Sequence, residues 1–473
     1  MGEGRVRPLQ ALIALWLSVI FVLYMAPTAT KYQAADLLAF VLLVLTWAAI
    51  GEARSGWLSA IKPVVPLLAI LGYVVAQELL WGGSDARPYM QQLLDGFVPY
   101  MLFYLLFRHL SSAAGRALLL AMVVFITPGL VHLAYMYFDI GLALQKGGVP
   151  FMTSSKQGLL EYVKDAPRVG RRYLSVGMLH LLWGGLLMAW HFRAGAGRIG
   201  AWVVVGLGML SLALLDARAA YVSVAIGGLL MTLAVGPART WSALRSLQPI
   251  GRGWKWALAA ILAGAVAVGY SAGKSRWVAM SYSFQAAAHD VLDAKDELAQ
   301  RPYVNAGYWS APIDDINACY LEGHFRCKVD QSAYLRMAWL LVGLTSVVEH
   351  PLGIGYSANH LGRLWGVADD KSKYQRSDSF LVEQIVCFGF PVIILYGLLF
   401  WGALRTLRRS VRSGEAHAAL VLVCGIIMVC AGRILVDVFS EGLWRYLMAL
   451  LGMYYGMLHA NGLRKLEELK CRN

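Results

Sequence analysis

The sequence predicts an all-α fold, a polytopic membrane helical bundle of about twelve transmembrane helices with one large outer loop that itself contains helices. Composition is the first observation behind this prediction. Of the 473 residues, 58% are hydrophobic and only 15% are charged, and the mean hydropathy is +0.56. Soluble domains of this length do not reach such values. The second observation is that the apolar residues form long continuous runs, which favours helices and excludes the alternating pattern of a membrane β-barrel.

The individual helices follow from runs of roughly 17 to 25 apolar residues, the length of one membrane crossing. They cover residues 9–26, 34–50, 64–81, 94–107, 117–138, 174–192, 200–215, 219–235, 256–270, 379–404, 416–438 and 443–460. This divides the chain into residues 1–270 with helices 1–9, a large loop at 271–378, and residues 379–473 with helices 10–12 and a cytoplasmic tail. No small-residue cleavage site follows the first run, so we expect it to remain as an anchor.

Basic residues fix the predicted orientation, because short cytoplasmic loops are enriched in Lys and Arg. With the N-terminus inside, alternate connections carry Arg54, Lys62, Arg108, Arg116, Arg193, Arg198, Arg239, Arg245, Arg252, Lys255, Arg405, Arg408, Arg409, Arg412, Arg464, Lys465, Lys470 and Arg472. Both termini are therefore predicted to be cytoplasmic. The formal net charge of +14 would suggest a nucleic-acid partner in a soluble protein. Here contact with membrane lipid accounts for it, and we expect no nucleic acid.

The loop at 271–378 is the only part of the chain with a soluble-like composition. Residues 334–348 are apolar but contain Arg336, which predicts an amphipathic helix at the outer membrane interface. Cys319 and Cys327 lie close in sequence within the same loop. They either form a disulfide, which an oxidising compartment would permit, or remain two thiols.

Ionisable residues at the outer ends of helices are candidates for function, because a charge at membrane depth is costly to keep. Asp216 and Arg218 lie in the turn between the seventh and eighth helices, where they could equally form an ion pair that closes the turn. Arg336 has no local partner of this kind. Arg433 lies four residues before Asp437, a spacing that favours an intrahelical pair.

A further polar group precedes the tenth helix. Arg376, Ser377 and Asp378 stand directly before the apolar run, and Ser377 or Asp378 could simply cap the helix from Phe380 onward. Two loop histidines, His350 and His360, have the side-chain chemistry of a general base. His350 precedes a proline at a helix end, so a capping or packing role is an equal alternative.

Arginines facing the outer leaflet suit a phosphate or pyrophosphate headgroup, because the guanidinium fork binds such oxygens bidentately. The sequence contains no Gly-rich phosphate loop after a strand, and only the acidic pairs Asp314–Asp315 and Asp369–Asp370 resemble a nucleotide-sugar metal motif. We therefore expect a lipid-linked donor, with no metal and no cofactor.

Three stretches resemble the O-antigen ligase and O-antigen polymerase superfamily of bacterial envelope glycan enzymes. They are LLDARAAYVSVAIGGLL at 214–230, LRMAWLLVGLTSVVEHPLGIGYSANHL at 335–361 and SDSFLVEQIVCFGFPVIILYG at 377–397. The similarity covers most of residues 200–460, whereas the first two hundred residues match only in hydropathy. Many members of the family have a His-Asn or His-Ser pair at the head of the third stretch, where this chain has Ser377 and Asp378.

The resemblance implies a multi-pass protein of the bacterial inner membrane with a periplasmic active site. It implies a metal-independent, inverting glycosyltransferase that moves a glycan from undecaprenyl pyrophosphate to a sugar hydroxyl of lipid A-core or another glycan acceptor. Arg218 and Arg336 would bind the pyrophosphate, with Asp216, Arg376 and Arg433 in support. The base would be Asp378, His360 or His350.

Two alternatives to an O-antigen ligase stay open. A polymerase of O-antigen or exopolysaccharide in the same superfamily would differ mainly in its acceptor. A transporter of lipid-linked sugar would also need many helices and arginines near a phosphate. We disfavour the transporter because the sequence shows no paired Gly or Pro interruptions at matching positions in two halves.

Overall fold

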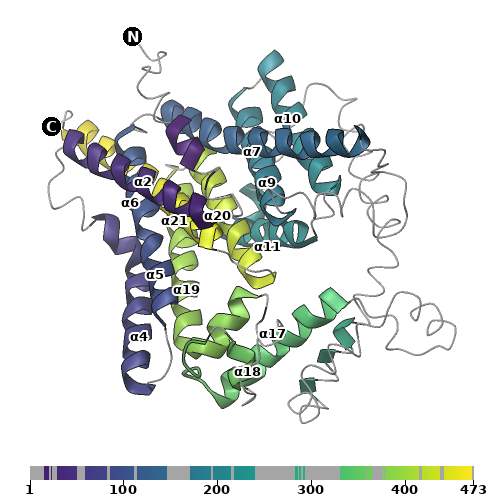
Figure 1. Cartoon of the computed structure of the whole chain (residues 1–473). Helices are drawn as coiled ribbons and strands as arrows, with labels where there is room; N and C mark the ends of the chain where they lie inside the picture. Colours follow the sequence, from purple (N-terminus) through teal and green to yellow (C-terminus); the bar gives the residue numbers. More distant parts are fainter. Residues whose placement is uncertain are drawn as a thin grey trace.

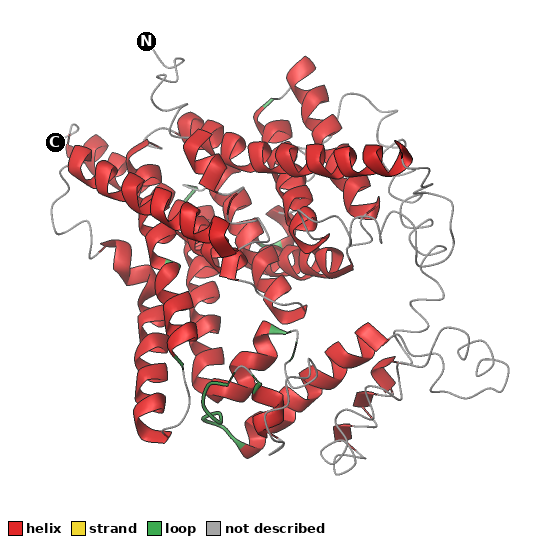
Figure 2. Cartoon of the chain, viewed as in Figure 1, coloured by secondary structure: helices red, strands yellow, loops and turns green. Residues whose placement is uncertain are grey.

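The computed structural model describes residues 15–20, 23, 29–50, 59–81, 86–110, 114–145, 171–192, 195–214, 218–239, 283–285, 287–288, 291–292, 331–357, 359–364, 377, 379–414, 418–436 and 441–470. Almost all of these residues are helical, and this described part of the chain contains no β-strand (Figure 2). The all-α prediction is confirmed to that extent.

The helices follow one another along the chain and pack into a bundle (Figure 1). They are α2 (Ala29–Ile50), η1 (Lys62–Val64), α4 (Val65–Trp81), α5 (Arg87–Asp95), α6 (Phe97–Leu110), α7 (Ala114–Gln145), α9 (Arg171–His191), α10 (Ala196–Leu214), α11 (Arg218–Val235), α17 (Gln331–Glu349), α18 (His360–Leu364), α19 (Phe380–Arg412), α20 (Ala418–Val436) and α21 (Glu441–Lys470). Each predicted span from 34–50 onward coincides with one of them, except the span at 256–270, which lies outside the described residues.

Two helical segments within the described ranges are long and apolar enough to cross a membrane, namely Ser59–Leu80 and Phe380–Arg412. Several other helices contain shorter apolar stretches, such as Leu118–Ala134 and Ala419–Ile434. The helical character of the predicted spans is confirmed where the structure describes them, from 34–50 to 219–235 and from 379–404 onward, while twelve membrane crossings and their orientation stay predictions.

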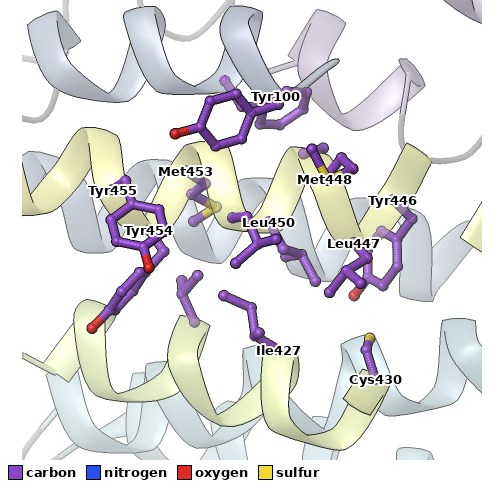
Figure 3. Close-up of a cluster of buried hydrophobic side chains, with 14 of the residues drawn as sticks. Tyr100, Ile427, Cys430, Tyr446, Leu447, Met448, Leu450, Met453, Tyr454 and Tyr455 are labelled. Atoms are coloured by element: carbon purple, nitrogen blue, oxygen red, sulfur yellow. The ribbon is translucent and has the colours of Figure 1, made fainter. Parts of the chain in front are cut away.

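The centre of the bundle is α21, which packs between α6 and α20 (Figure 3). Gly452 and Gly456 on α21 face the carbonyl groups of Tyr100 and Tyr104 on α6, so closely that a Cβ atom at either glycine would collide with them. Small residues four apart let two helix backbones approach in this way, and such packing is typical of helices in lipid. The GMYYG segment thus explains why α6 and α21 make the most extensive helix contact of the bundle.

Small residues also allow close contact in two other helix pairs. On α9, Gly177 lies against the His132 side chain of α7, and on α11, Gly227 lies against the Val429 backbone of α20. These contacts fix α7 beside α9 and α11 beside α20.

Three helices, α17, α18 and α19, position the region that contains several of the candidate site residues. The stretch 334–348 is helical, as part of α17, which packs with the short α18 against the first half of α19. Their shared apolar core contains Tyr334, Ala338 and Val342 from α17, Leu361 from α18 and Val386 from α19. The turn that joins α17 to α18 reaches the middle of α19.

Candidate functional site

The helix α19 is interrupted at its middle. Gly389 has a φ of +69° and a ψ of −157°, far from helical values, and Pro391 has no N–H to donate. The carbonyls of Val386 and Cys387 would normally accept from residues 390 and 391, so the break removes their helical donors. Buried carbonyls need a replacement partner, above all where no water is near.

The turn after α17 supplies the missing partners. Ile354 N donates to the carbonyl of Val386 and Gly355 N donates to that of Cys387, each at 3.0 Å. In return, Phe390 N donates to the carbonyl of Pro351 at 2.9 Å. The turn and the broken helix thus satisfy each other's backbone groups.

This exchange requires two glycines with positive φ. Gly353 has a φ of +78° and lies against the Cys387 carbonyl, and Gly389 lies against the Pro351 carbonyl. A Cβ atom at either position would collide with backbone atoms that side-chain movement cannot relieve. The HPLGIG segment is therefore shaped to fit this break.

Side chains of α4 hold the turn in place. The amide of Gln77 donates to the carbonyls of Leu352 at 2.8 Å and Cys387 at 3.0 Å, and so contacts both sides of the junction. The Tyr73 hydroxyl donates to the same Leu352 carbonyl at 2.7 Å. Gln77 is buried, so its amide must find such partners within the protein.

A tyrosine of α5 links the two halves of α19. The Tyr89 hydroxyl donates to Gln384 Oε1 at 2.5 Å and lies 3.1 Å from the Tyr396 hydroxyl. Its ring packs on Phe388, with 4.7 Å between the ring centroids. Burial raises the pKa of the Tyr89 phenol well above its ordinary value, so the hydroxyl keeps its proton and can donate.

The closest pair of reactive side chains in this region is His360 with Ser377, both buried. His360 Nε2 and Ser377 Oγ are 2.7 Å apart, and the Ser377 backbone N–H donates to the same nitrogen at 3.2 Å. A backbone N–H can only donate, so Nε2 is an acceptor without a proton, and the hydroxyl must donate to it as well. The Ser379 carbonyl is a second acceptor 3.1 Å from Ser377 Oγ, so the single hydroxyl proton is shared between this carbonyl and His360 Nε2.

This pair gives a hydroxyl directed at a basic imidazole nitrogen. Such an arrangement can take up a proton through the hydroxyl or activate the hydroxyl itself. The expected cap of α19 was wrong in one respect: Ser379, not Ser377 or Asp378, is the N-cap and accepts from Val382 N. Ser377 is thereby left to bind His360.

No family model matches the sequence, and the search of curated proteins found no match. The resemblance to the O-antigen ligase and polymerase superfamily therefore rests on the three quoted stretches alone. Among the described residues, no three His, Cys, Asp or Glu side chains are grouped so that they could hold a metal ion.

The other predicted site residues are not all brought together. Arg336 lies on α17 with its side chain half-buried, and His350 is exposed at the end of that helix. Arg433 is buried in a different place, a small and mostly apolar cavity between α9, α20 and α21. Its predicted partner Asp437 lies outside the described residues.

Three further predicted site residues, Asp216, Arg376 and Asp378, also lie outside the described residues. Arg218 is the first residue of α11, and the structure describes its backbone but not its side chain. The Cys319–Cys327 disulfide and most of the loop at 271–378 are likewise outside the described residues.

Sequence reasoning missed an ion cluster at the start of α21, in which a buried arginine binds two partly exposed carboxylates. Arg445 Nε lies 3.0 and 2.9 Å from the two carboxylate oxygens of Asp36 on α2, and its NH2 nitrogen lies 2.6 Å from Asp95 at the end of α5. The signal was available, because all three are ionisable residues at the predicted outer ends of spans. The rule that selected Arg433 selects Arg445 equally.

Proposed function

We propose that this protein is a membrane glycosyltransferase that moves a glycan from undecaprenyl pyrophosphate to a hydroxyl of lipid A-core or another glycan acceptor at the periplasmic face. One observation carries the proposal. The second and third stretches of the resemblance interlock at the break in α19, His360 of one lies 2.7 Å from Ser377 of the other, and Arg336 lies on α17, which packs on α19. A site for a charged lipid headgroup needs a cation and a base on such a rigid support.

In this proposal the arginines bind the leaving group. The guanidinium groups of Arg336 and Arg218 hold the pyrophosphate oxygens and stabilise the negative charge that develops there. The acceptor oxygen bonds to the anomeric carbon as the bond from that carbon to the pyrophosphate oxygen breaks. Attack from the opposite face inverts the configuration, and undecaprenyl pyrophosphate leaves as an anion.

The acceptor hydroxyl must lose a proton during this step. We assign the base to His360 acting through Ser377: the acceptor gives its proton to Ser377 Oγ, while the Ser377 proton passes to His360 Nε2 over the 2.7 Å hydrogen bond. The family's pair of a histidine and a serine would then be formed through space rather than by adjacent residues. Asp378 is the alternative base, and it adjoins Ser377 in the sequence.

Complementation of a deletion strain tests the proposal, with the lipopolysaccharide gel profile as readout. Arg336→Ala and His360→Gln should abolish transfer while the protein stays inserted, because glutamine can accept the Ser377 N–H bond but cannot take a proton. Arg336→Lys should recover little activity, since a point charge cannot replace the fork. The matched controls are Arg408→Ala and His109→Gln, at two exposed positions, and both should behave as wild type.

The profile of the deletion strain also separates the acceptors. Loss of all O-chains, with long polymer accumulating on undecaprenyl pyrophosphate, would indicate a ligase. A core that carries a single repeat unit would indicate a polymerase. Normal transfer by Arg336→Ala or His360→Gln would remove that residue from the site.

The break in α19 is the one observation that favours the alternative function, transport of a lipid-linked sugar. Transporters bind substrate with discontinuous helices, whose free carbonyls face the ligand. Here the carbonyls of Val386 and Cys387 instead accept from the turn after α17 and from Gln77. They are therefore occupied by the protein, which favours glycan transfer. An intact glycan on the periplasmic lipid carrier in the deletion strain would argue further against transport.

A further inference from the structure

The two halves of α19 are not joined by helical hydrogen bonds at Gly389, so other contacts must set the angle between them. The turn after α17 satisfies the backbone at the break itself. A change of φ and ψ at one glycine could still swing one half against the other, as hinges do. Ser377 precedes the first half and α18 with His360 packs on it, so this angle determines where the His360–Ser377 pair lies relative to the second half.

One side chain contacts both halves away from the break. Tyr89 donates its single proton to Gln384 of the first half at 2.5 Å. Its oxygen must therefore be the acceptor from the Tyr396 hydroxyl of the second half at 3.1 Å. The order of donation, from Tyr396 to Tyr89 to Gln384, forms one chain across the break. All three residues are buried, so water does not compete for these hydrogen bonds.

The helix that carries Tyr89 is itself fixed at both ends. At its start, Ala86 N donates to the Glu78 carboxylate at the end of α4, at 3.2 Å. At its end, Asp95 binds Arg445 of α21 at 2.6 Å. Tyr89 is therefore held on a support that does not belong to α19.

We propose that Tyr89 is a positioning residue of the outer-face site, which clamps the two halves of α19 at a fixed angle and thereby fixes the position of the His360–Ser377 pair relative to the second half of α19. The positioning role rests on the proposed function. The clamp itself does not rest on the proposed function, because it concerns only the contacts of Tyr89 with the two halves of α19. The two parts can therefore fail separately.

The thiol of Cys387 reports on the break without any glycan. Cys387 is fully buried two residues before Gly389, and Cys424 and Cys430 on α20 are buried reference thiols. The experiment measures alkylation of each cysteine by N-ethylmaleimide in purified full-length protein, resolved by peptide mass spectrometry. The variant is Tyr89→Phe, which keeps the ring and removes the hydroxyl.

We expect Cys387 in Tyr89→Phe to react on the order of tenfold faster than in wild type, the effect of losing one buried hydrogen-bonded group. Cys424 and Cys430 should keep their wild-type rates. Tyr396→Phe should accelerate Cys387 less, and the double variant should match Tyr89→Phe, because both hydroxyls belong to one chain. Tyr137→Phe, at an exposed tyrosine of α7, is the matched control and should change nothing.

Unchanged Cys387 alkylation in Tyr89→Phe would overturn the clamp, whether or not the chain transfers glycan. Equal acceleration of all three cysteines would overturn it too, since that indicates general loosening. The positioning role is tested by glycan transfer in cells at equal protein level, which should fall in Tyr89→Phe and stay normal in Tyr137→Phe. A faster Cys387 reaction with normal transfer would overturn the positioning role and leave the clamp standing.

Discussion

Replacing Gly353 by Ala tests whether the junction between the turn and α19 stabilises the fold. Gly353 has a φ of +78°, and a Cβ atom there would collide with the Cys387 carbonyl. The turn would have to move away from α19 to make room. That movement lengthens the hydrogen bonds from Ile354 N and Gly355 N, both now 3.0 Å.

The expected cost has two parts. A residue with a Cβ atom in the left-handed region costs about 1–2 kcal/mol. Each of the two lengthened hydrogen bonds contributes about 0.5–1.5 kcal/mol. We therefore expect Gly353→Ala to lower the free energy of unfolding by about 2–5 kcal/mol.

Substitutions at two other glycines allow the conformational cost to be measured apart from the cost of the lengthened hydrogen bonds. Gly414, after the end of α19, has a similar φ of +75° but faces open space, so Gly414→Ala should cost only the conformational part, about 1–2 kcal/mol. Gly397, on the second half of α19, also faces open space within a helix. Gly397→Ala should be neutral or stabilise by up to about 1 kcal/mol.

The assay is thermal unfolding of the purified full-length proteins in one detergent, followed by intrinsic fluorescence. Gly353→Ala should have the lowest Tm, Gly414→Ala an intermediate one, and Gly397→Ala a Tm at or above that of wild type. Equal Tm values for Gly353→Ala and Gly414→Ala would refute the reasoning, because the collision with α19 would then have no energetic effect.

Three further substitutions probe other contacts. Arg445→Met leaves two partly exposed carboxylates without their shared cation, which should cost about 1–3 kcal/mol in thermal unfolding; full retention of Tm would show that the cluster contributes no stability. Gly456→Val should drive α21 off α6 and reduce the yield of monodisperse protein on size-exclusion chromatography, whereas Gly228→Val, which faces open space, should give the wild-type yield. Gln77→Leu keeps the volume but removes the amide from Leu352, so we expect a loss of about 1–3 kcal/mol; unchanged heat stability would show that the turn is held by its own backbone.

Hydropathy alone was sufficient to locate most of the helices. The apolar runs coincide with helices of the structure from 34–50 onward wherever residues are described, because burying apolar side chains and satisfying backbone groups impose the same pattern on every helix. The same reasoning located the helix that contains Arg336, whereas its amphipathic character stays a prediction. Membrane crossing and sidedness depend on a lipid phase, which the packing of one chain does not determine.

The break in α19 was missed because hydropathy does not report on backbone conformation. The run from 379 to 404 is continuous in apolarity, yet it contains Gly389 and Pro391, two residues that disfavour a helix interior. Treating these two residues as helix breakers would have predicted the interruption of the helix. Their partner, the glycine turn after α17, lies within the stretch 335–361 that was quoted for the resemblance.

Long-range polar pairs could not be predicted from one sequence. Tyr89 and Gln384 are 295 positions apart, and Arg445 and Asp36 are 409 positions apart. Nothing local distinguishes such a tyrosine or glutamine from others in the chain. His360 and Ser377 are only 17 positions apart, but residues 365–376 between them gave no periodicity from which to infer their contact.

Helix α21 is held against α6 and at its own start by different kinds of contact. From its middle onward, α21 is held against α6 by the close backbone approach at Gly452 and Gly456. Near its start, the same helix is held by Arg445, and the neighbouring Trp444 ring meets that of Tyr396, 6.1 Å away between centroids. Hydrogen bonds and ion pairs have strict geometry, whereas apolar contacts tolerate sliding. The start of α21 is thus fixed by polar contacts of strict geometry to α2 and to α5, the helix that carries Tyr89.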